Sequence, residues 1–183
     1  MHTQPSWMRQ VVADLIRHEG FREFAYPDPL SPIAKKYRRI RWGFVPAGPF
    51  IENSNLNPRD GHPWTVGYGF TKQVTPYTKI SRAAANKLLE QVILDHLPVL
   101  DKVIPNWRRL PLFAQSVVIN MAFNMGNRLL QFKNSMAAIA NGQYDTAARN
   151  LRKSLWAKQV PNRANELISR LERRAIAKEH LVV

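Results

Sequence analysis

Two carboxylates near the N-terminus are the first candidates for chemistry. Glu19 ends a predicted helix, and Asp28 follows nine residues later in the turn-like segment Ala25-Tyr26-Pro27-Asp28-Pro29. A carboxyl group at a helix C-terminus lies near the negative end of the helix dipole, which disfavours ionisation and suits a proton donor. A second carboxylate facing it would supply the acid and base that glycosidic hydrolysis requires. By position alone, the plainer interpretation is favoured for both residues: a surface glutamate at a helix end and a turn-forming aspartate.

The elements around these residues are predicted from local signals. Apolar residues at helical spacing follow Ser6, a suitable N-cap, and Gly20 is a natural stop for that helix. Residues 21–71 contain seven of the thirteen prolines, which predicts turns, loops and short strands. Within them, residues 64–70 alternate like a short strand.

From Ser81 onward the pattern predicts helices. Ser81 caps a long helix that Pro98 should kink or restart. Leu112–Met125 is apolar on most sides, so we expect a buried central helix ended by Gly126. Further helices are expected at about 135–140, 145–156 and 161–178. The predicted fold class is α+β in one domain, residues 1–183. Its sheet-bearing lobe covers about 20–80, with an insertion at about 29–63, and its helical lobe combines about 81–183 with the N-terminal helix.

The composition of the chain limits the classes of partner and of chemical site that we expect. Lys and Arg number 27 against 13 Asp and Glu, a net charge of +14, which favours an anionic partner such as nucleic acid, a lipid surface or an acidic wall polymer. The chain has no cysteine, which excludes disulfides, thiol nucleophiles and thiolate-bound zinc. The first twenty residues lack an uninterrupted apolar stretch, so we expect no signal peptide. No window approaches 18 apolar residues, so no membrane span is expected.

Several separated motifs occur together and in order. They are Glu19-Gly20-Phe21-Arg22, Ala25-Tyr26-Pro27-Asp28, Trp64-Thr65-Val66-Gly67-Tyr68-Gly69, Ile119-Asn120-Met121-Ala122-Phe123-Asn124-Met125-Gly126, and Trp156 with Gln159-Val160-Pro161-Asn162-Arg163-Ala164. This set resembles the signature of phage-type lysozymes, glycoside hydrolase family 24, and the last two motifs resemble its T-even branch. The resemblance covers nearly the whole chain, except about thirty residues between Asp28 and Trp64.

The resemblance implies a lysozyme-like fold with the active-site cleft between the lobes. It implies an endolysin that hydrolyses the β-1,4 bond between N-acetylmuramic acid and N-acetylglucosamine, with inversion and without cofactor or metal. In this resemblance Glu19 matches the general acid, Asp28 the carboxylate that positions or activates water, and Thr65 the hydroxyl that helps to hold that water. Arg163 matches an arginine that pairs with the acid. Positions that match sugar contacts are Thr71, Phe123, Ser135 and Asn150. Core packing for Phe123 and a helix cap for Ser135 remain open.

The sequence departs from the family pattern at three places. Because of the insertion, Asp60, five residues before Thr65, competes with Asp28 as the second carboxylate. We favour Asp28, since the Ala-Tyr-Pro-Asp context accompanies it, and interpret Asp60-Gly61 as a tight turn. Phe70 stands where many relatives carry histidine, so an ion pair known there should be missing. Pro98 predicts a changed link between the lobes.

Two basic segments suggest a second partner. Residues Lys35 to Arg41 hold five basic residues in seven, and the C-terminal helix interleaves arginines with leucines and isoleucines. Both are hypotheses for contact with an anionic outer envelope or membrane surface; a solvated loop and a core-packed helix are the plainer alternatives.

We expect a monomer that binds peptidoglycan and no nucleic acid. It would be made in the host cytoplasm and act on the periplasmic wall after release through a hole made by another protein. A tail-associated or bacteriocin lysozyme, or a non-catalytic basic module that binds wall or nucleic acid, are the alternatives.

Overall fold

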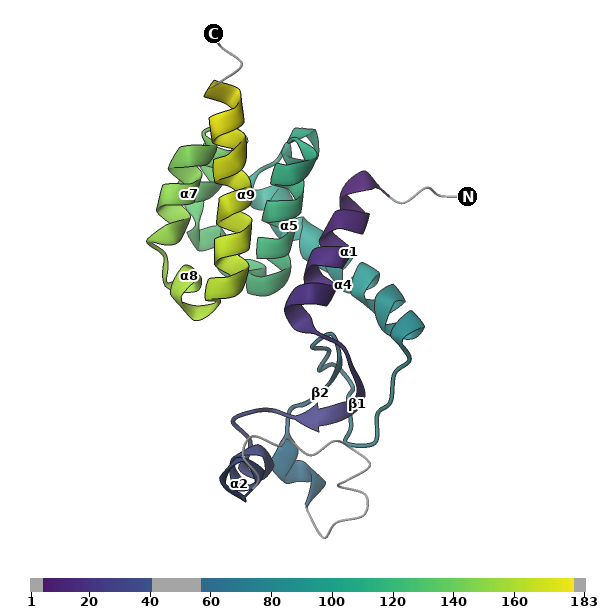
Figure 1. The fold of residues 1–183 in the computed structure, drawn as a ribbon. Helices are drawn as coiled ribbons and strands as arrows, with labels where there is room; N and C mark the ends of the chain where they lie inside the picture. Colours follow the sequence, from purple (N-terminus) through teal and green to yellow (C-terminus); the bar gives the residue numbers. More distant parts are fainter. Residues whose placement is uncertain (1–4, 41–56, 180–183) are drawn as a thin grey trace. The chain divides into compact units, whose positions relative to one another are not determined.

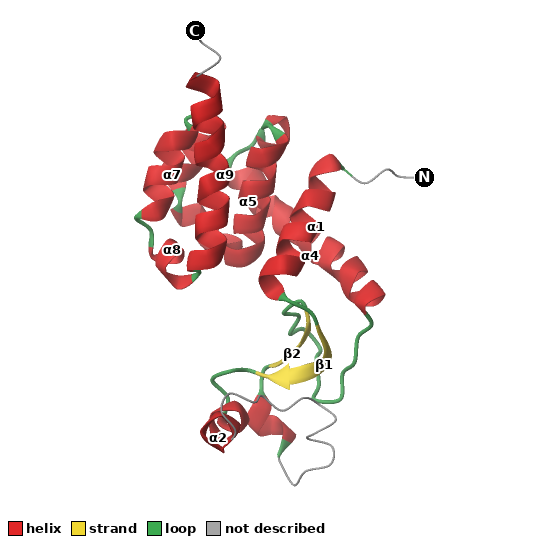
Figure 2. Ribbon diagram, in the orientation of Figure 1, coloured by secondary structure: helices red, strands yellow, loops and turns green. Residues whose placement is uncertain are grey.

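The computed structural model describes residues 5–40 and 57–179, and its helices and small antiparallel sheet confirm the α+β class (Figures 1 and 2). The chain divides into two compact units. One, here the hairpin unit, is Leu15–Leu89, and the other, the helical unit, combines Met1–Asp14 with Glu90–Val183. Whether residues 1–183 act as one domain stays a prediction.

The hairpin unit is built on two antiparallel strands, β1 (Arg22–Pro27) and β2 (Trp64–Gly67). The register pairs Tyr26 with Thr65 and Pro27 with Trp64. Ala25, Pro27 and Trp64 are buried, and the Trp64 indole N–H donates to the Pro58 carbonyl at 2.9 Å. One face of the hairpin therefore packs on the interior of this unit.

A helix lies where the sequence predicts only turns, loops and short strands, so that prediction is wrong for residues 32–40. Helix α2 (Pro32–Ile40) begins after Ser31, whose Oγ accepts a hydrogen bond from the Ala34 N–H at 3.2 Å. Pro32 takes the first helical position, where its missing N–H is tolerated, and Ile33 and Ala34 are buried. A short 3-10 helix, η1 (Pro58–Gly61), contacts α2. The rest of the insertion, 41–56, lies outside the described residues.

The long helix α4 (Arg82–Val103) continues through Pro98, so the expectation that it restarts there is wrong. Proline removes one backbone hydrogen bond from a helix interior. Leu97, Val99 and Leu100, on both sides of it, are buried in the core, and this packing supports the helix across the missing bond.

The helical unit forms around α5 (Leu112–Met125), which runs beside α9 (Pro161–Glu179) in Figure 1. Residues 114–122 of α5 are all buried, and Gly126 follows at φ 53°, which confirms the predicted central helix and its stop. The helix expected at 145–156 is instead divided at Ser154, whose Oγ donates to the Leu151 carbonyl at 2.6 Å and accepts from the Ala157 N–H at 3.2 Å. The remaining elements are η2 (Trp107–Arg109), η3 (Gly126–Gln131), α6 (Lys133–Ala140), α7 (Tyr144–Arg152) and α8 (Leu155–Gln159).

Helix α1 (Ser6–Glu19) is held in the helical unit by a buried ion pair. The Asp14 side chain is fully buried and lies 2.6 Å from the Arg170 guanidinium of α9. Arg170 also donates to Ser116 Oγ of α5 at 2.8 Å, and Gln10 donates to Asp14 at 2.9 Å. Three helices therefore meet at one carboxylate.

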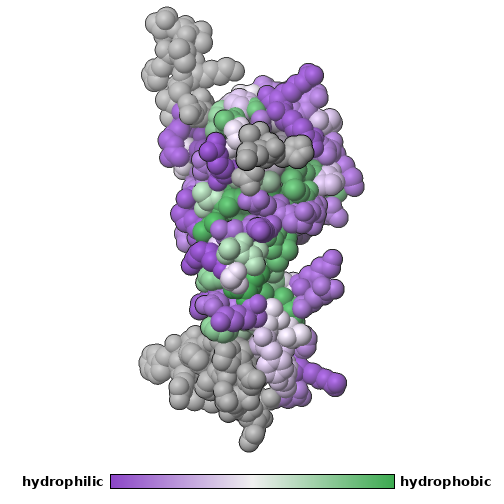
Figure 3. Space-filling model, turned by 90° about the vertical axis from the view of Figure 1, so that its right-hand side faces the viewer, coloured by the Kyte–Doolittle hydropathy of each residue, from purple (hydrophilic) through white to green (hydrophobic). Residues whose placement is uncertain are grey.

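Hydrophilic and hydrophobic residues alternate over the face in Figure 3. No helix within the described ranges is both long enough and apolar enough to cross a membrane.

We expect Asp14→Ala to lower the free energy of unfolding by about 3–5 kcal/mol, because it removes the fully buried partner of the mostly buried Arg170 guanidinium and leaves it only the more exposed Glu166 as a charged partner among the described residues. The matched control is Asp145→Ala, which removes the exposed partner of Arg149 and should cost no more than about 1 kcal/mol. Urea unfolding of both variants measures the difference, and equal losses would contradict this view of the pair.

Candidate active site

The chain turns sharply at the end of α1, where Glu19 is its last residue. The Gly20 N–H donates to the Ile16 carbonyl at 3.1 Å, and Gly20 has φ 66°, a conformation that favours glycine. This turn leads directly into β1, so the predicted stop at Gly20 is confirmed.

The Glu19 carboxyl group lies close to the turn after β2. A Cβ atom placed on Gly69 would be 3.7 Å from Glu19 Oε2, so the missing side chain at 69 leaves room beside the acid. The carboxyl group is half-buried. Its charge also acts on Tyr26: burial raises the pKa of the Tyr26 phenol, Arg22 opposes that rise, and Glu19 adds to it. Glu19 is therefore a neighbour of the hairpin face that carries Tyr26.

Thr65 and Asp28 belong to that same face. Thr65 pairs directly with Tyr26, and side chains of directly paired residues point to one face of a sheet. Asp28 lies two residues beyond Tyr26, the spacing that returns to the same face. All three are half-buried, in contrast to the buried residues between them. The structure thus gathers Glu19, Asp28 and Thr65 around Tyr26, a residue that sequence reasoning did not single out.

Of the two competing carboxylates, Asp28 is the better placed. Its N–H bonds to the carbonyls of Gly61 and Pro63 at 3.2 and 3.0 Å, which fixes it at the end of the hairpin. Its Oδ1 accepts from the Leu30 N–H at 2.7 Å. Asp60 is exposed on η1, a 3-10 helix rather than the two-residue turn expected there. The geometry favours Asp28, and its role stays a prediction.

The helical unit places two of the predicted sugar contacts in one pocket. Ser135 of α6 and Asn150 of α7 both line a pocket of about 440 Å³. Ser135 is the third residue of α6, while Phe132 occupies the N-cap position, so the alternative of a helix cap for Ser135 is wrong. The other lining residues are Gln131, Phe132, Lys133, Asn134 and Lys153.

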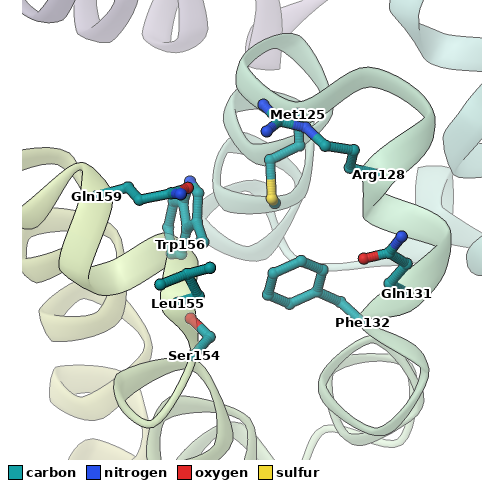
Figure 4. Close-up of a pocket in the computed structure, with 8 residues that line it drawn as sticks. All are labelled: Met125, Arg128, Gln131, Phe132, Ser154, Leu155, Trp156 and Gln159. Atoms are coloured by element: carbon teal, nitrogen blue, oxygen red, sulfur yellow. The ribbon is translucent and has the colours of Figure 1, made fainter.

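A second pocket, of about 380 Å³, shares Gln131 and Phe132 with the first (Figure 4). Trp156 is buried at its wall, with the indole N–H donating to Asn124 Oδ1 at 2.8 Å and the ring packed edge-on against Phe132. The remaining lining residues are Met125, Arg128, Ser154, Leu155 and Gln159. The described residues that line the two pockets include three cations and no carboxylate, which suits an anionic ligand. The sequence analysis includes Trp156 and Gln159 in a family motif but does not predict that they line a pocket.

The other predicted site residues lie outside both pocket linings. Phe123 is half-buried, with its ring 5.6 Å from that of His96. Thr71 is exposed after β2, and Arg163 is buried on α9. Their proposed roles stay predictions. In the part of the chain that the structure describes, no group of three His, Cys, Asp or Glu side chains could hold a metal ion.

Comparison with known proteins matches residues 51–177, more than half of the chain, to the family model described as phage lysozyme. The chain belongs to the phage lysozyme family. The matched span includes Asp60, Thr65 and the lining residues of both pockets, and it begins after Glu19 and Asp28.

One similar relative is "Probable T4-type lysozyme 1" of Dictyostelium discoideum, 37% identical over 67 residues. That alignment covers 36% of this chain and 39% of the relative, so the chain spans well under half the length of the curated relative that it matches.

The attachment of Asp28 to the hairpin can be tested through Gly61. A Cβ atom at 61 would lie 2.3 Å from Trp64 Cζ2 and 3.0 Å from Pro27 Cβ, and Trp64 is fully buried. We expect Gly61→Ala to cost about 1–3 kcal/mol of unfolding free energy through overpacking. Exposed Lys72→Ala should change it by less than about 0.5 kcal/mol. Thermal unfolding of both variants measures the difference. An unchanged stability in Gly61→Ala would show that the packing of Gly61 against Trp64 and Pro27 is loose.

Proposed function

We propose that this chain is a lysozyme-type peptidoglycan hydrolase that cleaves the β-1,4 bond between N-acetylmuramic acid and N-acetylglucosamine. The observation that carries the proposal is the placement of Glu19, Asp28 and Thr65 around one hairpin face, with Gly69 leaving room at the acid. Membership of the phage lysozyme family and the similarity to a T4-type lysozyme support it.

In the proposed reaction, Glu19 gives its proton to the glycosidic oxygen as the bond from C1 to that oxygen breaks. Asp28, with the Thr65 hydroxyl, orients a water molecule whose oxygen bonds to C1 and whose proton passes to Asp28. Attack from the opposite face of the sugar inverts C1, and this requires space for water between the carboxyl groups. Arg163 is proposed to pair with the acid.

Tyr26 contributes a neutral hydroxyl at the centre of this group. Its pKa is raised, chiefly by burial, so the phenol is protonated throughout the neutral range. A protonated phenol is a hydrogen-bond donor that adds no negative charge beside Glu19 and Asp28.

We place the glycan against the pocket that contains Ser135 and Asn150, with Thr71 and Phe123 as further sugar contacts. Amide and hydroxyl groups suit sugar hydroxyls, while Lys133 and Lys153 suit the carboxylates of a peptide-bearing wall polymer. The net charge of +14 supports an anionic wall as target. In this proposal the enzyme is a monomeric endolysin, made in a host cytoplasm and released to the wall for lysis.

The acid and the water-orienting carboxylate are tested by hydrolysis of purified peptidoglycan. Glu19→Gln and Asp28→Asn should each lower the rate by about 10²–10⁴-fold, because each removes a proton-transfer group. Asp60→Asn is the matched control and should keep near-full activity. Loss in Asp60→Asn but not in Asp28→Asn would move the water-orienting role across the insertion. A folded wild-type chain that releases no muropeptides would end the enzyme proposal.

The binding role of Asn150 is tested by Asn150→Ala. We expect KM for soluble glycan strands to rise about 2- to 10-fold with kcat nearly unchanged, since the change removes about one neutral hydrogen bond from substrate binding. Exposed Lys158→Ala, outside the pocket lining, should alter neither constant. An unchanged KM in Asn150→Ala would remove this pocket from the substrate path.

A further inference from the structure

Helix α2, within the insertion, presents charge on one side and packs on the other. Ile33 and Ala34 are buried, whereas Lys35 and Lys36 are exposed. The helix has no acidic residue, and its sequence supplies two more basic residues, Arg38 and Arg39. The charges of Lys35 and Lys36 are therefore directed away from the interior of the hairpin unit.

The neighbouring segments add one more cation and an apolar side chain. η1 contacts α2 and carries exposed Arg59, and Leu30, just before the Ser31 cap, is 72% exposed. The backbone bonds from Asp28 to Gly61 and Pro63 hold the start of this segment beside η1. We call Leu30, Lys35, Lys36 and Arg59 the α2 surface.

The cations of the α2 surface are available for an external partner. Among the described residues, no ion pair involves Lys35, Lys36 or Arg59. Of the described carboxylates on the same segments, Asp60 is exposed on η1 and Asp28 accepts a hydrogen bond from Leu30. Neither forms an ion pair with Lys35, Lys36 or Arg59 among the described residues.

The other candidate for a membrane surface, the C-terminal helix α9, is already engaged. Leu167, Ile168 and Leu171 are fully buried, so the described part of the apolar stripe on which that hypothesis rested faces the core. Arg170 pairs with Asp14 and Glu166. The described part of α9 thus follows the plainer alternative of a core-packed helix.

We propose that the α2 surface binds the phosphate-bearing headgroups of an anionic lipid bilayer. The cations attract the phosphates, and Leu30 enters the apolar boundary beneath them, the combination by which peripheral proteins bind anionic membranes. A free phosphate or a soluble polyanion would leave no role for a leucine exposed at the edge of a basic helix. The proposal is independent of glycan hydrolysis, which is proposed for Glu19, Asp28 and Thr65 and uses no residue of the α2 surface.

The test is co-sedimentation of the full chain with vesicles of phosphatidylglycerol or of phosphatidylcholine. Wild type should bind only the anionic vesicles, less tightly as salt rises. Lys35→Gln/Lys36→Gln/Arg59→Gln should lose affinity on the order of 100-fold, given the usual contribution of each basic residue. The matched control, Lys87→Gln/Lys102→Gln/Lys158→Gln, removes the same charge from exposed positions elsewhere and should lose far less. Leu30→Ser should weaken binding at unchanged charge.

Equal losses in the two triple variants would overturn the proposal, because binding would then follow net charge alone. Unchanged binding of Leu30→Ser would also overturn it, as would equal affinity for a DNA duplex, since a polyanion would then explain the data. Circular dichroism checks that each variant folds. Hydrolysis of purified peptidoglycan by the α2 triple variant should remain at the wild-type level, so failure of the lipid proposal and failure of the enzyme proposal are distinguishable.

Discussion

The buried pair between Asp14 and Arg170 is the constraint on which the packing of the helical unit depends. A fully buried carboxylate requires partners, and here a guanidinium and a glutamine amide provide them. The same guanidinium donates to Ser116, so α1, α5 and α9 are joined by one buried polar cluster. A carboxylate whose burial would be costly alone thus becomes part of the cluster that joins these three helices.

The hairpin holds Asp28 and Thr65 of the candidate site in place whatever the length of the insertion between them. Asp28 is bonded to the carbonyls of Gly61 and Pro63, so the chain leaves and re-enters the hairpin at one closed neck. Longer loops closed at a fixed neck add little entropic cost, and the register that opposes Tyr26 with Thr65 is preserved. The insertion can therefore acquire α2 and its basic residues while the face beside Glu19 stays unchanged. The candidate catalytic residues and the basic residues of α2 therefore lie in different parts of the hairpin unit.

Local signals predicted much of this fold. Gly20 and Gly126 end helices as expected, and the apolar run of α5 is the buried centre, because caps, stops and periodicity act over a few residues. Two predictions were wrong because tertiary packing overrides the local signal. Helix α4 continues through Pro98 because its neighbours are packed in the core, and the burial of Ile33 and Ala34 stabilises helix α2 in a proline-rich stretch. For the candidate site, the sequence named Glu19, Asp28 and Thr65, yet only strand register shows that Tyr26 lies among them. The pockets beside Phe132 and Trp156 arise from separate helices, so no local pattern could reveal them.

The net charge of +14 acts through those cations that the fold leaves without internal partners. Arg108, Arg149, Arg152 and Arg170 are matched by carboxylates within the helical unit. Among the described residues, Lys133 and Lys153 at one pocket, and Lys35 and Lys36 on α2, form no ion pair. Charge that is paired inside a protein contributes little to its external field, whereas unmatched charge attracts anions over roughly a Debye length. The positive field of this chain therefore includes a contribution from a pocket suited to an anionic polymer and one from a helix suited to an anionic surface. Other cations, such as Lys87, Lys102 and Lys158, also form no ion pair among the described residues and add to it.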